Sequence, residues 1–244
     1  MFITPIIFDM LKIVELTKSY RDSLAVDRLS LHVEQGDIFG FIGHNGAGKT
    51  TTIRAAAGAL DFDSGDIFIC GNSIKTDPIS CKKQMAYIPS SPEVYTYMTG
   101  IQYLSFIADM FSVPDGERKR LIDDYAERFE MTRQLGNLIS SYSQGMKQKI
   151  SIIGALVHSP RVLMLDEPFV GLDPVASHTL KLIMAEICND GGAIFFSTHV
   201  LDTAEKLCTK IAIIKQGRLI ASGGMDELRG DKSLEELFLE LVEK

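Results

Sequence analysis

GHNGAGKT, at residues 43–50, matches the pattern G-x-x-x-x-G-K-[ST] of a phosphate-binding loop. The apolar run at 37–42 before it indicates a buried strand, and the helix formers at 51–57 after it indicate the start of a helix. Between a strand and a helix, glycines let backbone N–H groups point at phosphate oxygens without interference from a Cβ atom. The stretch therefore predicts a nucleotide phosphate site in an α/β protein.

The side chains of this loop have separate predicted roles. We expect Lys49 to reach the β- and γ-phosphates and the Thr50 hydroxyl to ligate Mg²⁺. The competing interpretation is a glycine turn that fits the pattern by chance, and the strand and helix on either side argue against it. The other residues of the loop region that we expect to contact the nucleotide are Gly43, Asn45, Gly46, Ala47, Gly48 and Thr51.

The composition excludes some classes of partner. The 244 residues include 25 Lys and Arg and 32 Asp and Glu, which gives a formal net charge of −7. A nucleic-acid-binding protein would need a basic stripe instead. The four cysteines form no CxxC pair, which is typical of reduced thiols in the cytosol. No apolar run is long enough to cross a bilayer, so we expect the chain itself to be soluble.

Strand patterns occupy both ends of the chain. The early runs are short and separated by turns, which indicates an N-terminal β part. The late runs are continuously apolar, as expected of parallel strands covered on both faces. Together these patterns predict an α/β domain over residues 11–244. The predicted strands are 11–16, 30–33, 38–42, 66–70, 84–89, 162–165, 193–196 and 211–214.

Helical spacing dominates the middle of the chain. From about 95 to 160 the apolar residues recur at i, i+3 or i+4, and we expect an all-helical subdomain at about 91–160 inserted into the α/β core. Residues 1–10 lack the features of a signal peptide and are interpreted as a disordered or weakly docked extension. Further helices are predicted at 175–189, at 200–208 and around Leu234, Leu237, Phe238 and Leu241. We expect the C-terminal one of these helices to pack on its own domain, and a dimer contact is the less favoured alternative.

Two acidic residues follow the apolar run 162–165. Asp166 and Glu167 lie at the carboxyl end of a predicted buried strand, where ligands bind in open α/β sheets. Beside a phosphate loop, we expect Asp166 to partner Mg²⁺ and Glu167 to polarise the attacking water. A solvated acidic pair that caps the turn before Pro168 is the competing interpretation, and the phosphate loop makes it the weaker one.

A second anion site is predicted at the start of the helix near Met146. Ser143 is a natural N-cap, and Gly145 leaves backbone N–H groups accessible. An ordinary helix cap would have the same composition, so local sequence alone leaves both interpretations open.

Two further residues are candidates by their position. His199 ends the strand at 193–198, at the sheet edge that carries Asp166, and could donate to a γ-phosphate oxygen. Tyr20 precedes the phosphate loop and could stack on an adenine, although a partly buried structural tyrosine explains it nearly as well.

Taken in order, these motifs closely resemble those of the ATP-binding subunits of ABC transporters, from about residue 11 onward. Residues 43–50 resemble the Walker A loop, 142–148 (YSQGMKQ) the ABC signature in the form common among ATPases paired with type-2 permeases, and 162–168 Walker B. The remaining matches are the D-loop at 171–174, the switch histidine at 197–199 and Tyr20 at the aromatic A-loop position.

The resemblance implies a P-loop NTPase fold, with a RecA-like parallel core, an N-terminal antiparallel β part and the inserted helical subdomain. It implies ATP hydrolysis with Mg²⁺ in a head-to-tail dimer, each ATP lying between Lys49 and Thr50 of one copy and Ser143 and Gly145 of the other. It also implies a separate membrane permease, through which this cytoplasmic subunit is held at the inner face of the cell membrane. Export is the favoured direction of transport. The second ATP-binding subunit could be an identical copy or a related chain.

Three positions depart from the family pattern. His44 stands where proline is common, at a variable position of the loop. The signature reads YSQGM in place of LSGGQ but keeps Ser143 and Gly145. Ser90 stands where the family has a glutamine or glutamate that contacts Mg²⁺ and water, so a serine there needs a bridging water or a shifted loop. We expect weaker coupling between the γ-phosphate and the helical subdomain.

Two other classes of protein share the phosphate loop. An ABC ATPase acting on ribosomes or DNA, without a permease, usually has tandem ATPase domains or coiled-coil insertions, and this chain shows neither. A P-loop kinase for a small molecule would not explain the signature, the D-loop or a glutamate directly after Asp166. The sequence therefore favours a transporter ATPase and does not identify the transported substrate.

Overall fold

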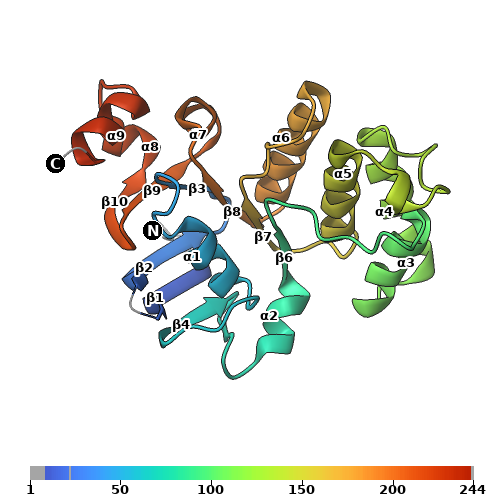
Figure 1. Ribbon diagram of the computed structural model, residues 1–244, viewed down its shortest axis with the longest axis horizontal. Coiled ribbons are helices and arrows are strands. Elements are labelled where there is room, and N and C mark those ends of the chain that lie inside the picture. Colours follow the sequence, from blue (N-terminus) through green and yellow to red (C-terminus); the bar gives the residue numbers. More distant parts are fainter. Residues whose placement is uncertain (1–8, 22, 243–244) are drawn as a thin grey trace, which may run out of the picture.

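The computed structural model describes residues 9–21 and 23–242, and within these the strands form two sheets. The smaller sheet is antiparallel between its paired strands, in the order β2-β1-β4-β5. It lies beside α1, in the lower part of the view in Figure 1. Its strands are β1 (Asp9–Tyr20), β2 (Ser23–Glu34), β4 (Ser64–Ile69) and β5 (Asn72–Ser73).

The larger sheet has the order β10-β9-β3-β8-β7-β6. All its neighbours pair in parallel except β10, which is antiparallel to β9. Because β3, β8 and β7 are adjacent and parallel, the loops after them meet at one sheet edge. The strands are β3 (Ile38–Ile42), β6 (Met85–Ile88), β7 (Val162–Asp166), β8 (Ala193–Thr198), β9 (Lys210–Lys215) and β10 (Arg218–Gly224).

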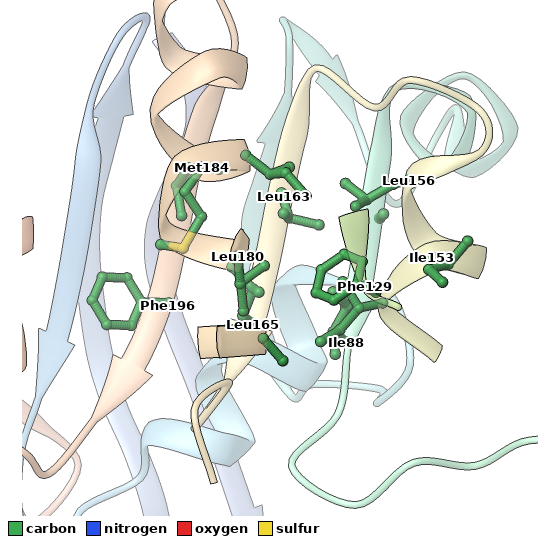
Figure 2. Packing of buried hydrophobic residues seen from close by; sticks show 14 of the residues in the cluster. Ile88, Phe129, Ile153, Leu156, Leu163, Leu165, Leu180, Met184 and Phe196 are labelled. Atoms are coloured by element: carbon green, nitrogen blue, oxygen red, sulfur yellow. The ribbon is translucent and has the colours of Figure 1, made fainter. Parts of the chain in front are cut away.

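The continuously apolar central strands supply two separate cores. Side chains alternate across a strand, so Leu163 and Leu165 of β7 pack on one face, while Val162 and Met164 pack on the other. The first face is covered by α6 and by the helices around α5. Figure 2 shows Leu163 between Met184 of α6 and Leu156 of α5. The other face is shared with the antiparallel sheet and α1.

The helices separate into those that flank the sheets and those that gather at the far end of the molecule, where α3, α4 and α5 lie together (Figure 1). The flanking helices are α1 (Lys49–Ala56), α2 (Pro78–Gln84), α6 (Pro174–Asn189), α7 (Leu201–Leu207), α8 (Met225–Arg229) and α9 (Leu234–Val242). The others are α3 (Gly100–Met110), α4 (Asp115–Arg128), the short 3₁₀ turn η1 (Ile139–Ser141) and α5 (Gln144–Leu156).

The expected strands are present, but the first two are much longer than predicted. Both are interrupted by β-bulges, where Glu15 and Arg28 adopt positive φ angles of 50° and 45°. A bulge shifts the alternation of buried and exposed side chains, so the sequence pattern shows only a fragment of each strand. Met10, assigned to the N-terminal extension, is buried in β1. Asp9 of that predicted extension also belongs to β1, and residues 1–8 lie outside the described residues.

Helix α2 was not predicted. It begins with Pro78 in its first turn, and the Asp77 side chain accepts a hydrogen bond from Ser80 N at 3.2 Å. Proline and an aspartate cap are strong start signals, but a helix of seven residues is too short to show a period. Gln84, predicted to open a strand, ends this helix instead. Across the described part of the chain, no helix combines the length and apolar character needed to cross a membrane.

Candidate nucleotide site

The phosphate loop connects β3 to α1 and is braced from both sides by backbone. A Cβ on Gly43 would lie 2.6 Å from the Ile214 carbonyl oxygen, and one on Gly48, whose φ is 109°, would lie 2.5 Å from the Ala25 carbonyl oxygen. Glycine is thus required at these two positions because neighbouring strands approach the loop closely. Gly217 N also donates to Ala47 O at 2.9 Å, so the β9–β10 turn supports the loop.

Lys49 is buried at the base of the loop. Its Nζ donates to the carbonyl oxygens of Gly43 at 2.6 Å and of His44 at 3.2 Å. Burial lowers the pKa of Lys49, while the nearby Glu167 and Asp166 carboxylates act to raise it. Two carbonyl oxygens therefore hold the ammonium, with Glu167 Oε1 3.8 Å away. An anionic ligand at this place would stabilise its charge further.

Asp166 joins the phosphate loop to the neighbouring strand. Its Oδ2 accepts a hydrogen bond from Thr50 Oγ1 at 2.9 Å, and its Oδ1 accepts one from Ser197 Oγ at 2.6 Å. The parallel register of β7 and β8 sets Asp166 opposite Ser197. Both oxygens of this buried carboxylate are thus fixed before any ligand arrives.

Glu167 leaves the sheet in a strained conformation, with a φ of 49°. Its backbone N–H is directed at Ser197, with Oγ at 3.1 Å and the carbonyl oxygen at 3.3 Å. Its Oε1 lies 3.8 Å from Lys49 Nζ and 2.9 Å from His199 Nδ1. Since a left-handed non-glycine residue costs free energy, the contacts around it must impose this geometry.

The donor set suits Mg²⁺. A hydroxyl and a carboxylate oxygen 2.9 Å apart, on Thr50 and Asp166, are the hard ligands that this ion prefers. In the described residues no group of three or more His, Cys, Asp and Glu side chains could hold a metal. Magnesium would therefore keep phosphate oxygens and water as its other ligands, which is its usual behaviour.

A pocket of 190 Å³ opens above these groups. Ser90, which follows β6, lies in its wall, so the predicted neighbour of the metal reaches this site. The pocket is lined by Ala25, His44, Asn45, Gly46, Gly48, Lys49, Thr50, Thr51, Ser90, Asp166 and Glu167.

The shape of this site and the fold around it can be compared with known proteins. Residues 26–170 match the family described as ABC transporter. This chain belongs to that family. The ABC-type transporter ATP-binding protein EcsA of Bacillus subtilis (strain 168) is 34% identical over 240 residues, which are 96% of this chain and 97% of EcsA.

Two further matches agree. The bacitracin transport ATP-binding protein BcrA of Bacillus licheniformis is 34% identical over 221 residues, 90% of this chain and 71% of BcrA. A solved structure described as the ATP-binding subunit of an ABC transporter superimposes with a TM-score of 0.91 at 34% identity, covering 95% of this chain and 99% of that one. The predicted fold class is confirmed, and the chain is an ABC transporter ATP-binding subunit, an ATPase that uses ATP with Mg²⁺.

The ABC signature residues lie outside the phosphate pocket. Ser143 caps α5, its Oγ accepting from Met146 N at 3.3 Å, and α5 starts at Gln144, two residues earlier than predicted. Gly145 lies against the D-loop, where an added Cβ would be 3.1 Å from Gly171 O. Neither Ser143 nor Gly145 lines the pocket that holds the Walker A lysine.

Two of the other predicted residues, His199 and Tyr20, do not line the phosphate pocket. His199 contacts Glu167, and its Nδ1 carries the proton there because a carboxylate can only accept; its Nε2 would donate to a phosphate only from a protonated ring. Tyr20 ends β1, is 46% exposed and does not line the pocket, but Lys18 Nζ lies 5.3 Å from its ring centroid. Ala25, in the same β1–β2 hairpin, does line the phosphate pocket.

Sequence reasoning missed two polar groups at this site. Ser197 orients both Asp166 and the backbone of Glu167. Its position at a strand end beside Walker B was a signal, but the β7–β8 pairing was needed to show it. Lys149 Nζ lies 2.7 Å from Asp173 Oδ2, which ties the signature helix to the N-cap of α6. That ion pair joins the signature to the D-loop within one chain.

Proposed function

We propose that this subunit hydrolyses ATP at a site formed by two copies of the chain arranged head to tail. The observation that carries the proposal is the separation of Ser143 and Gly145 from the phosphate pocket. At 190 Å³ the pocket is smaller than the roughly 300–1,000 Å³ of a typical ligand site. A pocket of this size suits a polyphosphate that is bound on one side by this chain and on the opposite side by a second molecule. The N-terminus of α5, with its accessible N–H groups, is suited to bind that opposite side.

Each of the residues of one chain then has a separate role in ATP hydrolysis. Lys49 balances the negative charge of the β- and γ-phosphates, and Thr50 and Asp166 hold the Mg²⁺ that would neutralise developing charge. Glu167 accepts a proton from the attacking water, and His199 fixes its Oε1. The loop residues Gly43, Asn45, Gly46, Ala47, Gly48 and Thr51 cradle the phosphates, Ser90 reaches the water through a second water, and Tyr20 stacks on the adenine.

Mixing two inactive variants tests the shared site. Lys49→Ala removes the Walker A charge, and Gly145→Asp places a carboxylate at the signature. In a mixed dimer, one of the two sites combines an intact phosphate loop with an intact signature. We expect phosphate release to reappear on mixing, with neither variant active alone. No recovery, with active wild-type chain, would show that the site is not shared between identical copies.

We propose that a type-2 permease docks in a groove beside this site. The groove has a volume of 610 Å³ and is lined by residues of α1, β6, α3 and α5, including Arg54, Tyr87 and Ile107, and by His158 just after α5. It also includes Thr50, Ser90 and Asp166, so it is continuous with the phosphate pocket. An occupant of the groove would therefore contact both the nucleotide-binding core and the helical end of the molecule.

Exposed aromatic rings extend this groove. Tyr95 contacts Tyr103 of the groove wall at a centroid distance of 6.2 Å, and it also contacts Tyr97 and Phe106. Tyr97 is 72% exposed. Aromatic side chains with polar tips are enriched at protein interfaces, so the surface fits a cytoplasmic segment of the permease.

Co-purification tests the docking surface. We expect Ile107→Asp to abolish capture of the subunit by the membrane protein encoded in the neighbouring reading frame, because a charge in an apolar wall is costly to bury. Leu239→Asp, at an exposed position of α9, is the matched control and should be captured normally. Equal capture of both variants would rule out this groove.

We further propose that the assembled transporter exports its substrate and holds this chain at the cytoplasmic face of the membrane. The support is the likeness to BcrA, described as a bacitracin transport protein, and the signature form seen in type-2 systems. The alternative, an ABC ATPase acting on a soluble partner, is less favoured by these relatives.

A further inference from the structure

The C-terminal helix reaches the phosphate loop. Phe238 of α9 is buried, and its ring centroid lies 4.9 Å from that of His44, with the rings at 68°. This edge-on arrangement is a favourable aromatic geometry. His44 is the loop residue that departs from the family proline, and the reaction gives its side chain no part. The contact therefore gives the departure a structural partner 194 positions further along the chain.

Helix α9 is held at both ends, so Phe238 is presented at a defined place. At its start, Leu234 N donates to Glu205 Oε2 of α7 at 3.1 Å, and Leu234 itself is buried. Near its end, the Val242 carbonyl oxygen accepts from Lys215 Nζ of β9 at 2.7 Å. Helix α9 is the last helix of the described chain and lies beside α8 (Figure 1). A displacement of α9 would break these contacts together with the ring contact.

The backbone of His44 explains why the ring contact reaches the ligand site. The His44 carbonyl oxygen accepts from Ala47 N at 3.1 Å and from Lys49 Nζ at 3.2 Å. One oxygen thus closes the turn of the loop and orients the ammonium that faces the phosphates. Any shift of the His44 backbone would change both hydrogen bonds.

We propose that Phe238 is a positioning residue for nucleotide binding, which acts by packing on the His44 ring and holding the first half of the phosphate loop in its receiving shape. The loop then needs little reordering when a nucleotide arrives, and less binding free energy is lost to ordering. The inference rests on the proposed role of the loop and adds the C-terminal helix to the site.

A double-mutant cycle on nucleotide affinity tests this role. The Kd of Mg-ADP for the whole chain is measured by titration calorimetry, because ADP avoids turnover. We expect Phe238→Ala and His44→Ala each to weaken binding by about three- to ten-fold, the range of an aromatic pair. The double variant should be no weaker than either single one. Leu239→Ala, an exposed neighbour on the same helix, is the control and should bind as wild type.

The conservative variants separate positioning from stability. Phe238→Tyr keeps the ring and should bind within about two-fold of wild type, while Phe238→Leu keeps apolar volume without the ring and should show most of the loss. It also replaces Phe238→Ala in the cycle if that variant does not fold. Losses that multiply in the double variant, or an unchanged Kd without the Phe238 ring, would overturn the proposal. Absence of Mg-ADP binding in wild type would overturn the role of the loop itself.

Discussion

The Walker side of the site and the signature side differ in how completely one chain builds them. On the Walker side, Asp166 accepts hydrogen bonds from Thr50 and Ser197, and Lys49 donates to the Gly43 carbonyl oxygen. On the signature side, Ser143 is exposed, and its hydroxyl accepts one weak cap bond from its own helix. The polar groups of the first side are held by partners on other elements, whereas the Ser143 hydroxyl bonds to its own helix. Long-range pairing thus orders the Walker side, and a local helix cap orders the signature side.

The largest expected effect separates hydrolysis from binding on the Walker side. Glu167→Gln removes the carboxylate that accepts the proton from water, and we expect ATP turnover to fall by about 10²- to 10⁴-fold. The amide keeps the shape, so an ATP-stabilised dimer should accumulate and be visible by gel filtration. Glu127→Gln, on the exposed surface of α4, is the control. Normal turnover in Glu167→Gln would remove Glu167 from the catalytic role.

The next effect concerns the signature side. Gly145→Asp places a carboxylate where the phosphates of the other copy's nucleotide should lie, and its Cβ crowds Gly171 O. We expect a loss of about 10²-fold in turnover, as when one anion-stabilising donor is removed. The Kd of Mg-ADP for the single chain should stay within two-fold of wild type by calorimetry. Weakened ADP binding would mean that the two sides are not separate in one chain.

A moderate effect is expected where the two sides are joined. Lys149→Met breaks the 2.7 Å ion pair to Asp173, which caps α6. Asp173 is half exposed, and pairs of this kind contribute about 0.2–1 kcal/mol, so turnover should fall by about two- to five-fold with ADP affinity unchanged. Lys147→Met, two residues earlier on the same helix, is the control. Equal effects of both substitutions on turnover would show that the ion pair is not the cause.

The smallest effect concerns Ser90, which lines both the groove and the phosphate pocket. Ser90→Gln gives the pocket wall a side chain long enough to contact the metal and water directly. Replacing a water-bridged contact by a direct one is worth about 0–2 kcal/mol, and at the low end of that range basal ATPase should rise by about two-fold. Stimulation by the permease should also increase. If both rates stay at their wild-type values, the serine does not weaken the coupling.

Local patterns predicted much of this protein. The phosphate loop, the position of Asp166 and Glu167 and the cap at Ser143 are properties of short segments, so residue type and spacing were sufficient. The first two strands were underestimated because bulges at Glu15 and Arg28 interrupt their alternation. Helix α2 was missed because it is too short to establish a period.

The sequence by itself therefore determined the family and the nucleotide, since each motif carries its chemistry within a few positions. The tertiary structure alone decided which distant groups support them. Ser197 reaches Asp166 across 31 positions because β7 and β8 pair in parallel, and Phe238 reaches His44 because α9 folds back onto the loop. Such contacts depend on strand order and helix docking, which no local spacing encodes.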